Sequence, residues 1–477
     1  MRLPAGSLRQ QLDCGVTRLR DASQVFQGTT GLNQVVSSYR HPLVAVAGAL
    51  SLTVPWVGVQ LAGIDLGNGA TVAVSGVAVL GASFLLAWAA ETAEKDVPRA
   101  FAIAVLAILA VAPEYAVDAL YAWNAGAQAG TEAGAEAANL AVANMTGANR
   151  ILIGLGWSGI ALMTVRLAQK TDDPAVESRS GRLRDVVTLD RSIATEIAFL
   201  ALATLWAFFI PLGDGIDALD TAILVGIYTT YILVVIFSGH RTAEEHVGVP
   251  HYFQAFPRPQ RIAFVLGGFA YSGLMIFTAV EPFAHGLEEI GTSIGVPPFF
   301  MIQWIAPLAS ESPELIVVAV LVYKARSTAG FNALISSKLN QWTLLIGTLA
   351  VVYSLALGGY ETLPFDEKQT LEIWITAAQS YFALAVLINL NISIREALTL
   401  LVLFVSQVVI EFLIFRNVVA LGVSSNDLLL GYTVVYLVLG TALFVRRRRS
   451  VGVILRLTGE TIRRAVNRES RPADHAD

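Results

Sequence analysis

The feature of this sequence that most restricts its fold is a succession of twelve long apolar stretches separated by short polar connections. A helix needs about 20 apolar residues to cross the hydrocarbon core of a bilayer. Helices satisfy their backbone hydrogen bonds internally, so they can span a region without water. The predicted spans cover residues 42–64, 70–92, 99–124, 138–165, 191–211, 218–239, 261–284, 297–323, 331–358, 370–389, 393–415 and 428–446. We therefore expect an all-α polytopic membrane protein with about 12 transmembrane helices.

The composition excludes several classes of protein. Of the 477 residues, 55% are hydrophobic and only 14% are charged, which is too apolar for a soluble domain. No basic, aromatic-laced patch indicates nucleic-acid binding. The single cysteine, Cys14, provides neither a disulfide nor a thiolate metal site. The expected partners are inorganic cations and the lipid bilayer, with no bound cofactor; the oligomeric state stays open.

Loop charge predicts the orientation of the chain. Lys and Arg gather in the N-terminal segment, in the connections after the fourth, sixth, eighth and tenth spans, and after the twelfth span. The opposite connections contain only Lys368 and Arg416. Because positively charged loops stay in the cytoplasm, we expect both termini on the cytoplasmic side of the plasma (cell inner) membrane.

The chain contains an internal repeat. A shift of 200 residues places "VPRAFAIAVLAILAVAPEYAVDAL" on "PPFFMIQWIAPLASESPELIVVAV", so that Pro113–Glu114 falls on Pro313–Glu314. The predicted topology makes these two helices cross the membrane in opposite directions. Residues 70–239 and 261–415 therefore read as two inverted repeats of five helices, an arrangement typical of secondary transporters with a site at the bilayer midplane.

The rest of the chain flanks these repeats. The expected parts are a cytoplasmic N-terminal segment (1–41), one peripheral transmembrane helix at each end (42–64 and 428–446), a cytoplasmic linker (240–260) and a basic cytoplasmic tail (447–477). Apolar residues recur at helical spacing in both terminal segments, which indicates amphipathic helices on the membrane surface. Unstructured basic ends are the alternative for both.

Four acidic residues lie within the Pro-Glu helices. Asp118 stands one turn after Glu114, and Glu311 stands three residues before Glu314, so each pair shares a helix face. An ionised carboxylate inside a bilayer costs several kcal/mol unless it is paired, protonated or bound to a metal. Carboxylate oxygens suit hard cations such as Na⁺ and Ca²⁺.

The two prolines add a second source of oxygen ligands. Proline has no backbone N–H, so Pro113 and Pro313 are expected to free the carbonyls of Leu109 and Ala309.

The alternative for the acids is neutralisation of Arg150 and Lys338 in the facing helices. Recurrence of Pro-Glu favours a functional role for Glu114 and Glu314, whereas Asp118 and Glu311 have no acidic counterpart in the other repeat.

These motifs resemble those of the sodium/calcium exchanger family, within the cation/calcium antiporter superfamily. The helices "LAVAPE" and "ASESPE" are followed by the polar helices "ANMTGANRIL" and "NALISSKLNQ", and the resemblance covers roughly residues 70–415. It implies that Glu114 and Glu314 are the central cation ligands. The candidate ligand set also includes Glu311, Asp118, Ser310, Ser337, Asn149, Asn340 and Gln341. For Asn149 and Asn340, polar packing between helices is the alternative.

The sequence also departs from the family pattern. Where the family has hydroxyl groups before the first Pro-Glu, this chain has Ala110 and Val111. Arg150 and Lys338 bring positive charge onto the ligand-bearing helices. We hypothesise that one of them acts as a tethered cation in place of a sodium ion; the alternative is a base that snorkels toward the membrane surface.

The expected function is a secondary active cation antiporter of the sodium/calcium exchanger type, with alternating access around a midplane carboxylate site. Burial disfavours the charged form of a carboxyl group, so protons compete with metal ions there. Na⁺/H⁺ or another cation/H⁺ antiport is therefore the alternative on the same fold. A passive channel is remote, because channels use rings of residues in an oligomer rather than one inverted pair within a chain. An intramembrane enzyme is remote, because the chain has no H-E-x-x-H motif and no histidine inside a signature span. We do not expect an enzyme.

Overall fold

The computed structural model describes residues 41–96, 111–179, 183–238, 248–416 and 424–469. By its internal contacts the chain divides into two units, Met1–Gly48 and Ala49–Asp477. The helices are α3 (Pro42–Ala62), α4 (Asn68–Ala93), α7 (Ala112–Ala127), α8 (Glu132–Ile151), α9 (Ser158–Thr171), α10 (Ala194–Ala207), α11 (Ala218–Ser238), α12 (Val249–Gln254), α13 (Arg258–Ser293), α14 (Pro298–Phe300), α15 (Ala306–Tyr323), α16 (Ser327–Asn340), α17 (Ile346–Leu357), α18 (Glu367–Leu387), α19 (Ile394–Phe415), α20 (Ser425–Arg446) and α21 (Arg448–Glu469).

Short elements interrupt or connect these helices. The π-helical segments are η2 (Leu152–Trp157), η5 (Met301–Ile305) and η6 (Gln341–Leu345), and the 3₁₀ turns are η3 (Arg191–Ile193) and η4 (Ile210–Leu212). The strands are β1 (Val176–Glu177), β2 (Val186–Thr188), β3 (Gly215–Ile216), β4 (Leu363–Pro364) and β5 (Asn391–Ser393).

The helical, polytopic fold is confirmed. Within the described residues, 11 helical stretches are long and apolar enough to cross a membrane, and each coincides with a predicted span. The remaining predicted span, 99–124, lies partly outside the described residues, and its described part is α7. Residues 1–40 of the predicted N-terminal segment and residues 240–247 of the predicted linker also fall outside them.

One predicted loop is wrong. The stretch "HGLEEIGTSIG" after residue 284 continues α13, which runs unbroken to Ser293. Nothing in this stretch breaks a helix before Gly295, which has a positive φ. The Tyr121 hydroxyl of α7 also donates to Glu288 Oε1 at 2.6 Å, which ties the polar end of α13 to the first repeat.

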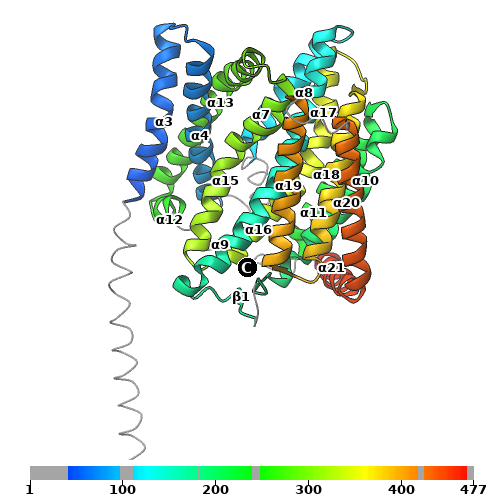
Figure 1. The fold of residues 1–477 in the computed structure, drawn as a ribbon. Helices are drawn as coiled ribbons and strands as arrows, with labels where there is room; N and C mark the ends of the chain where they lie inside the picture. Colours follow the sequence, from blue (N-terminus) through cyan, green and yellow to red (C-terminus); the bar gives the residue numbers. More distant parts are fainter. Residues whose placement is uncertain (1–40, 97–110, 180–182, 239–247, 417–423, 470–477) are drawn as a thin grey trace, which may run out of the picture. The chain divides into compact units, whose positions relative to one another are not determined.

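The packing contacts repeat between the two halves. Helix α7 packs on α8 and α17, as α15 packs on α16 and α9. Likewise α8 packs on α18 as α16 packs on α10, and α9 packs on α19 as α17 packs on α11. Figure 1 shows the paired helices running side by side through the bundle. The contacts interchange when α7–α11 are exchanged with α15–α19, as expected for an internal twofold repeat.

Two short strand pairings carry the same symmetry and reveal its inversion. Strand β2, between α9 and α10, pairs with β5, between α18 and α19 (Val187 opposite Ile392). Strand β4, between α17 and α18, pairs with β3, between α10 and α11 (Ile216 opposite Leu363). Because β2 precedes α10 and β3 follows it, the two pairings lie at opposite ends of that helix. The sequence gives no signal for strands of two or three residues.

The polar helices of the two repeats share an interruption. Helix α8 passes into π-helix at Leu152, and α16 does so at Gln341. These two positions coincide when "ANMTGANRIL" is aligned with "NALISSKLNQ". A π-helical turn holds one extra residue and changes which face the following helix presents.

Gly147 allows the backbones of the two repeats to pack closely. A Cβ atom on Gly147 of α8 would lie 1.8 Å from the backbone oxygen of Gln303 in η5. Only glycine allows the two backbones to pack this closely.

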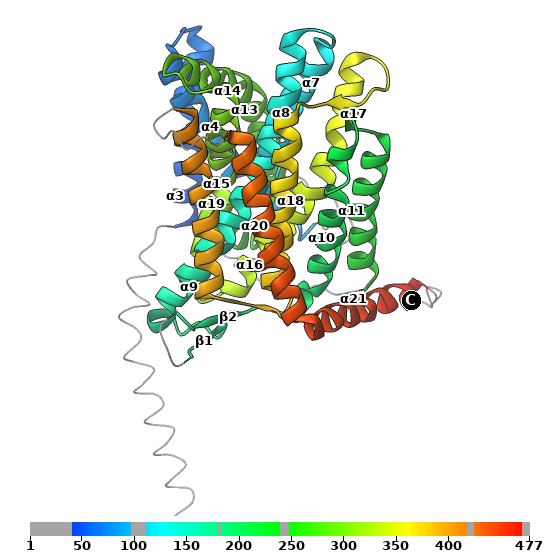
Figure 2. The ribbon, with the colours of Figure 1, turned by 45° about the vertical axis from the view of Figure 1, so that its right-hand side comes forward.

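The C-terminal tail forms a helix. Helix α21 packs against α10 and α11, burying Ile454 and Ala465. Figure 2 shows that it runs across the ends of these helices rather than along them, at the same end as β1 and β2. Leu455 and Val466 remain exposed, so α21 is amphipathic, as its spacing predicts.

Candidate cation site

Four carboxylates from the two repeats meet between α7 and α15. Glu114 lies within electrostatic reach of Asp118 and Glu314, and Glu311 lies within reach of Glu114 and Glu314. The exposed fractions of Glu114, Asp118 and Glu311 are 3%, 0% and 1%. We call these four residues the carboxylate cluster.

Local structure positions the two glutamates differently. Helix α7 begins at Ala112 with Pro113 in its first turn, so Glu114 lies at a helix N-terminus, where a negative charge is favoured. Helix α15 instead continues through Pro313, and Glu314 lies in its interior. The expected free carbonyl of Ala309 accepts a hydrogen bond from the Ser312 hydroxyl at 2.7 Å. Leu109 and Ala110 lie outside the described residues.

Each acid receives one hydrogen bond from a neutral side chain. Asn144 Nδ2 donates to Asp118 Oδ1 at 2.9 Å, and Gln341 Nε2 donates to Glu311 Oε1 at 2.5 Å. Ser337 Oγ donates to Glu314 Oε2 at 2.9 Å, and the Ser310 hydroxyl bonds to Glu114. These bonds orient the carboxylates.

Several oxygens in this region remain unsatisfied. Four buried oxygens have no hydrogen-bond partner among the described residues: Asp118 Oδ2, Asn144 Oδ1, Glu311 Oε2 and Gln341 Oε1. Oxygens of this kind are the ligands that hard cations take. No three acidic side chains in the described parts of the chain are already grouped as a metal site. A bound cation would therefore take neutral oxygens along with carboxylates.

Lys338 and Asn149 meet across the interface between the repeats. They occupy the same position in the two aligned polar helices. Lys338 Nζ donates to Asn149 Oδ1 at 2.7 Å and to the Asn149 carbonyl at 3.2 Å, and it lies 4.3 Å from the centroid of the Trp342 ring. Lys338 is fully buried and interacts with Glu311. The lysine is thus the positive charge beside the carboxylate cluster.

Asn340 lies on the other side of this helix. Its Oδ1 accepts a hydrogen bond from the Tyr115 hydroxyl at 2.9 Å. This contact links α16 to α7 next to Glu114.

Arg150 belongs to a separate buried network. Its Nη1 atom lies 2.8 Å from Glu372 Oε2, it donates to Gln379 and Gln407, and its guanidinium lies over the Trp304 ring. Lys368 Nζ lies 2.6 Å from Glu411 Oε1 and 3.8 Å from Glu372 Oε1, and Gln407 donates to Glu411. We call Arg150, Lys368, Glu372 and Glu411, with Gln379 and Gln407, the arginine network. Among the described residues, Arg150 makes no hydrogen bond or ion pair with the carboxylate cluster, and it reaches Lys338 only through long-range repulsion.

Three residues of these two sites are absent from the candidate set drawn from the sequence: Asn144, Glu372 and Glu411. Asn144 lies in the quoted stretch "ANMTGANRIL", and its sequence separation from Asp118 does not reveal that the two side chains are in contact. Glu372 and Glu411 were detectable as acids inside predicted spans, which are rare and mark functional or paired positions.

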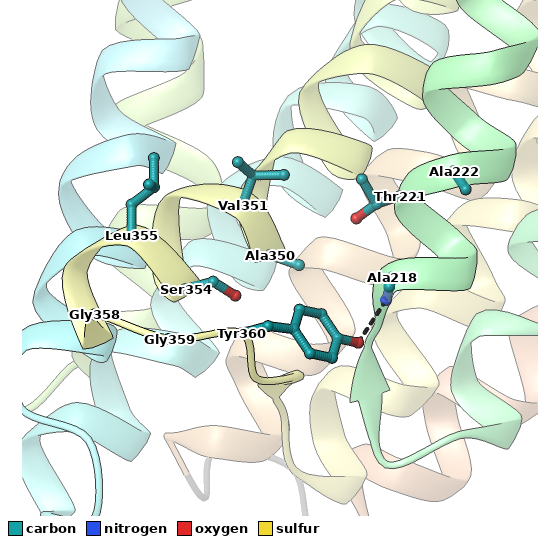
Figure 3. Close-up of a pocket in the computed structure, with 10 residues that line it drawn as sticks. All are labelled: Ala218, Thr221, Ala222, Ala350, Val351, Ser354, Leu355, Gly358, Gly359 and Tyr360. Carbon is teal, nitrogen blue, oxygen red and sulfur yellow. Dashed lines mark hydrogen bonds between the residues drawn. The ribbon is translucent and has the colours of Figure 1, made fainter.

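A cavity of about 560 Å³ lies elsewhere, between α11 and α17 (Figure 3). Its walls include Ala350 and Leu355, and the Tyr360 hydroxyl accepts a hydrogen bond from the backbone N–H of Ala218 at 2.8 Å. No candidate ligand lines it, and its lining is mostly apolar. It is therefore not the cation site.

Comparison with known proteins places this geometry in context. The family model for "Sodium/calcium exchanger protein" matches residues 68–237 and 264–413. The crystal structure of the H⁺/Ca²⁺ exchanger CAX is 39% identical, with a TM-score of 0.78, over 89% of this chain and 98% of that chain. No curated protein sequence matches the chain.

More distant solved structures share the fold. Native YfkE is 15% identical over 78% of this chain and 100% of that chain, with a TM-score of 0.52. A selenium-substituted Ca²⁺/H⁺ antiporter protein YfkE is 14% identical over 77% of this chain and 98% of that chain, with a TM-score of 0.50. The family-model match covers more than half of the chain, and the chain therefore belongs to the sodium/calcium exchanger family, as a cation/Ca²⁺ antiporter.

Proposed function

We propose that this protein is a secondary active Ca²⁺/H⁺ antiporter, in which Ca²⁺ and protons compete for the carboxylate cluster. The family resemblance on its own favours Na⁺ as the coupling ion, with the proton as the alternative. The observation that carries the proposal is the convergence of four buried or half-buried acids from both repeats, with one buried lysine beside Glu311.

The charge of this site supports proton coupling. Four ionised carboxylates and one charged lysine have a net charge of −3, which one Ca²⁺ reduces to −1. Without Ca²⁺ the same buried acids need other positive charge, because an uncompensated buried charge costs several kcal/mol. Two protons taken up for each Ca²⁺ released keep the charge of the site constant. The expected exchange ratio is therefore about two protons per Ca²⁺.

The supply of neutral oxygens favours protons over Na⁺. Na⁺ requires several oxygen ligands of its own. The oxygens of Asn149 accept hydrogen bonds from Lys338, and the Ala309 carbonyl accepts one from Ser312. Val111 replaces a hydroxyl residue of the family pattern in the first repeat. A proton needs only a carboxylate. The similarity to an H⁺/Ca²⁺ exchanger at 39% identity supports the same choice.

We assign the candidate residues to three roles. Glu114, Glu314, Asp118 and Glu311 bind Ca²⁺ directly and take up protons in its absence. Ser310, Ser337, Gln341, Asn149 and Asn340, with Asn144, orient these acids or supply neutral oxygens. Lys338 is the tethered cation of the site, and Arg150 is a structural residue of the arginine network.

For the orientation we propose cytoplasmic termini in the plasma membrane. The arginines after the twelfth predicted span belong to α21 and its neighbours, at the same end as β1 and β2 (Figure 2). Basic segments flanking short membrane connections stay in the cytoplasm. Rocking of the two symmetric halves would then expose the site to each side in turn.

Transport in proteoliposomes tests the coupling ion. The purified protein is reconstituted with a Ca²⁺ dye and a pH dye inside, with the voltage clamped by K⁺ and valinomycin. An acidic interior should drive Ca²⁺ uptake and become more alkaline as Ca²⁺ enters, whereas an outward Na⁺ gradient should drive none. Glu114→Gln and Glu314→Gln should abolish uptake, and the exposed acid variant Glu289→Gln on α13 should not.

The other outcomes separate the alternatives. Uptake that follows the Na⁺ gradient without a pH change would contradict proton coupling and favour Na⁺/Ca²⁺ exchange. Ca²⁺ flux that ignores both opposing gradients would indicate a channel.

A further inference from the structure

An arginine-lined cavity lies at the end of the bundle that carries α21. Its volume is about 950 Å³, and it opens between the β1–β2 connection, the start of α19 and the end of α20. Five arginines line it: Arg179, Arg184, Arg395, Arg446 and Arg447. Glu396 is the one acidic residue in the described lining.

The acid in this cavity is already paired. Glu396 receives hydrogen bonds from the Ser393 N-cap and forms an ion pair with Arg447. Arg447 also donates to the carbonyls of Ala385 at 3.0 Å and Val386 at 2.6 Å. These contacts hold the Arg447 side chain in one position on the inner side of the cavity.

The arginines of the cavity outnumber its acidic residues. The side chains of Arg184 and Arg446 make no ion pair or hydrogen bond with any other residue that the structure describes. The Arg179 side chain forms an ion pair with the exposed Glu177 at 3.0 Å. Several guanidinium groups around one concave space attract an anion strongly, because their charges add and their planar N–H groups fit phosphate oxygens.

The position of the cavity indicates where that anion comes from. Arg446 is the last residue of the membrane-spanning helix α20, and Arg395 lies in the first turn of α19. Helix α21 begins two residues after Arg446 and crosses the end of the bundle (Figure 2). Its residues Leu455 and Val466 are exposed. A helix with an apolar exposed side and many arginines lies in the headgroup layer of a membrane. The cavity therefore opens at headgroup depth.

From these observations we infer that this cavity binds the phosphate of an anionic lipid headgroup, with Arg184 and Arg446 as its principal ligands. Basic pockets at the ends of transmembrane helices recognise such headgroups. The site is separate from the carboxylate cluster and is independent of which ion drives transport.

Thermal unfolding of the purified, delipidated protein tests this inference. Phosphatidylglycerol should raise the melting temperature above the value in phosphatidylcholine, because a ligand that binds only the native state stabilises it. In Arg184→Gln/Arg446→Gln the midpoint of the phosphatidylglycerol titration should move up by about tenfold or more. The matched control, Arg166→Gln/Arg191→Gln, removes two arginines outside the cavity and should keep the wild-type midpoint. Arg184→Lys/Arg446→Lys keeps the charge and should retain most of the response.

Two results would overturn the inference. Equal lipid responses in the cavity variant and the matched control would mean that phosphatidylglycerol acts through general surface charge. A full response to millimolar inorganic phosphate alone, lost in the cavity variant, would mean that the pocket takes a soluble phosphate compound rather than a lipid. If the double glutamine variant does not fold, the single variants Arg184→Gln and Arg446→Gln, which should each shift the midpoint in the same direction, and lipid retention in native mass spectrometry decide the outcome.

Discussion

The carboxylate cluster and the arginine network are both buried, both charged and both built against α8, but their charges are arranged in opposite ways. The cluster consists of four acids with one lysine beside it, whereas the network has two acids, one arginine and one lysine. In the cluster, Asp118 and Glu311 each keep an oxygen without a partner in the described structure. In the network, Gln379 and Gln407 bond to Arg150, and both acids have a basic partner, although Glu372 Oε1 also has no hydrogen-bond partner in the described structure. The two regions therefore differ in charge balance. Each acid of the network has a basic partner, whereas the cluster has more acids than bases and needs a cation or protons.

Two adjacent residues of α8 separate these regions. Asn149 contacts Lys338 beside the cluster, and Arg150 contacts Glu372 on α18. Neighbouring residues on a helix point in different directions. One helix can therefore serve an ion site and a structural anchor with consecutive side chains.

The largest expected effect is on transport. Glu314→Gln should lower Ca²⁺ flux by about 100-fold or more, because a neutral amide cannot balance the charge of the ion. The melting temperature without Ca²⁺ should stay the same or rise, because a buried charge has been removed. Proteoliposome flux and thermal unfolding measure the two effects. A variant that loses stability together with transport would place Glu314 in the structural class.

Arg150→Gln should instead lower the stability of the fold. It leaves Glu372 buried without its arginine, and breaking such a pair costs about 3–5 kcal/mol. Denaturant or thermal unfolding in detergent measures this loss. Adding Glu372→Gln should restore much of the stability, since neither charge then remains unpaired. If the double variant is as unstable as the two single losses summed, the pair is not the unit proposed here.

Gly147→Ala tests the packing between the two regions. The added Cβ would meet the backbone oxygen of Gln303 at 1.8 Å, which forces α8 away from η5. Overpacking of this kind costs about 1–3 kcal/mol. Gly159→Ala is the matched control, because nothing lies within 4 Å of its Cβ position. Equal stability of the two variants would show that α8 can shift freely at Gly147.

Lys338→Gln should give the smallest of these effects, a change in Ca²⁺ affinity alone. Removing one positive charge beside the acids should raise Ca²⁺ affinity by about tenfold, equivalent to about 1.4 kcal/mol. Calorimetric Ca²⁺ titration at fixed pH measures it. Arg150 lies outside the cluster, so its variant, where it folds, should leave this affinity within a factor of about three. Unchanged affinity in Lys338→Gln would exclude its role as a tethered cation.

The sequence was sufficient to predict the long spans and the meeting of the two Pro-Glu helices. Both follow from local hydrophobicity and from the internal repeat, which are visible along the chain. The arginine network was not predictable in the same way. Arg150 finds Glu372 through packing of α8 on α18, and no periodicity connects two such distant positions. The hydrogen bond from Ser312 to Ala309 likewise depends on a side-chain rotamer rather than on the proline that frees the carbonyl.

The two π-helical turns also carry a record of how this chain arose. They begin at matched positions, Leu152 in the first half and Gln341 in the second, although the loops before them differ in length. An extra residue in a helix is an insertion, and two separate insertions at the same place require two events. A single five-helix ancestor that already carried the insertion, duplicated once, requires one. The most economical history therefore places the π turn before the duplication, so that it is older than the two-repeat transporter that now contains it.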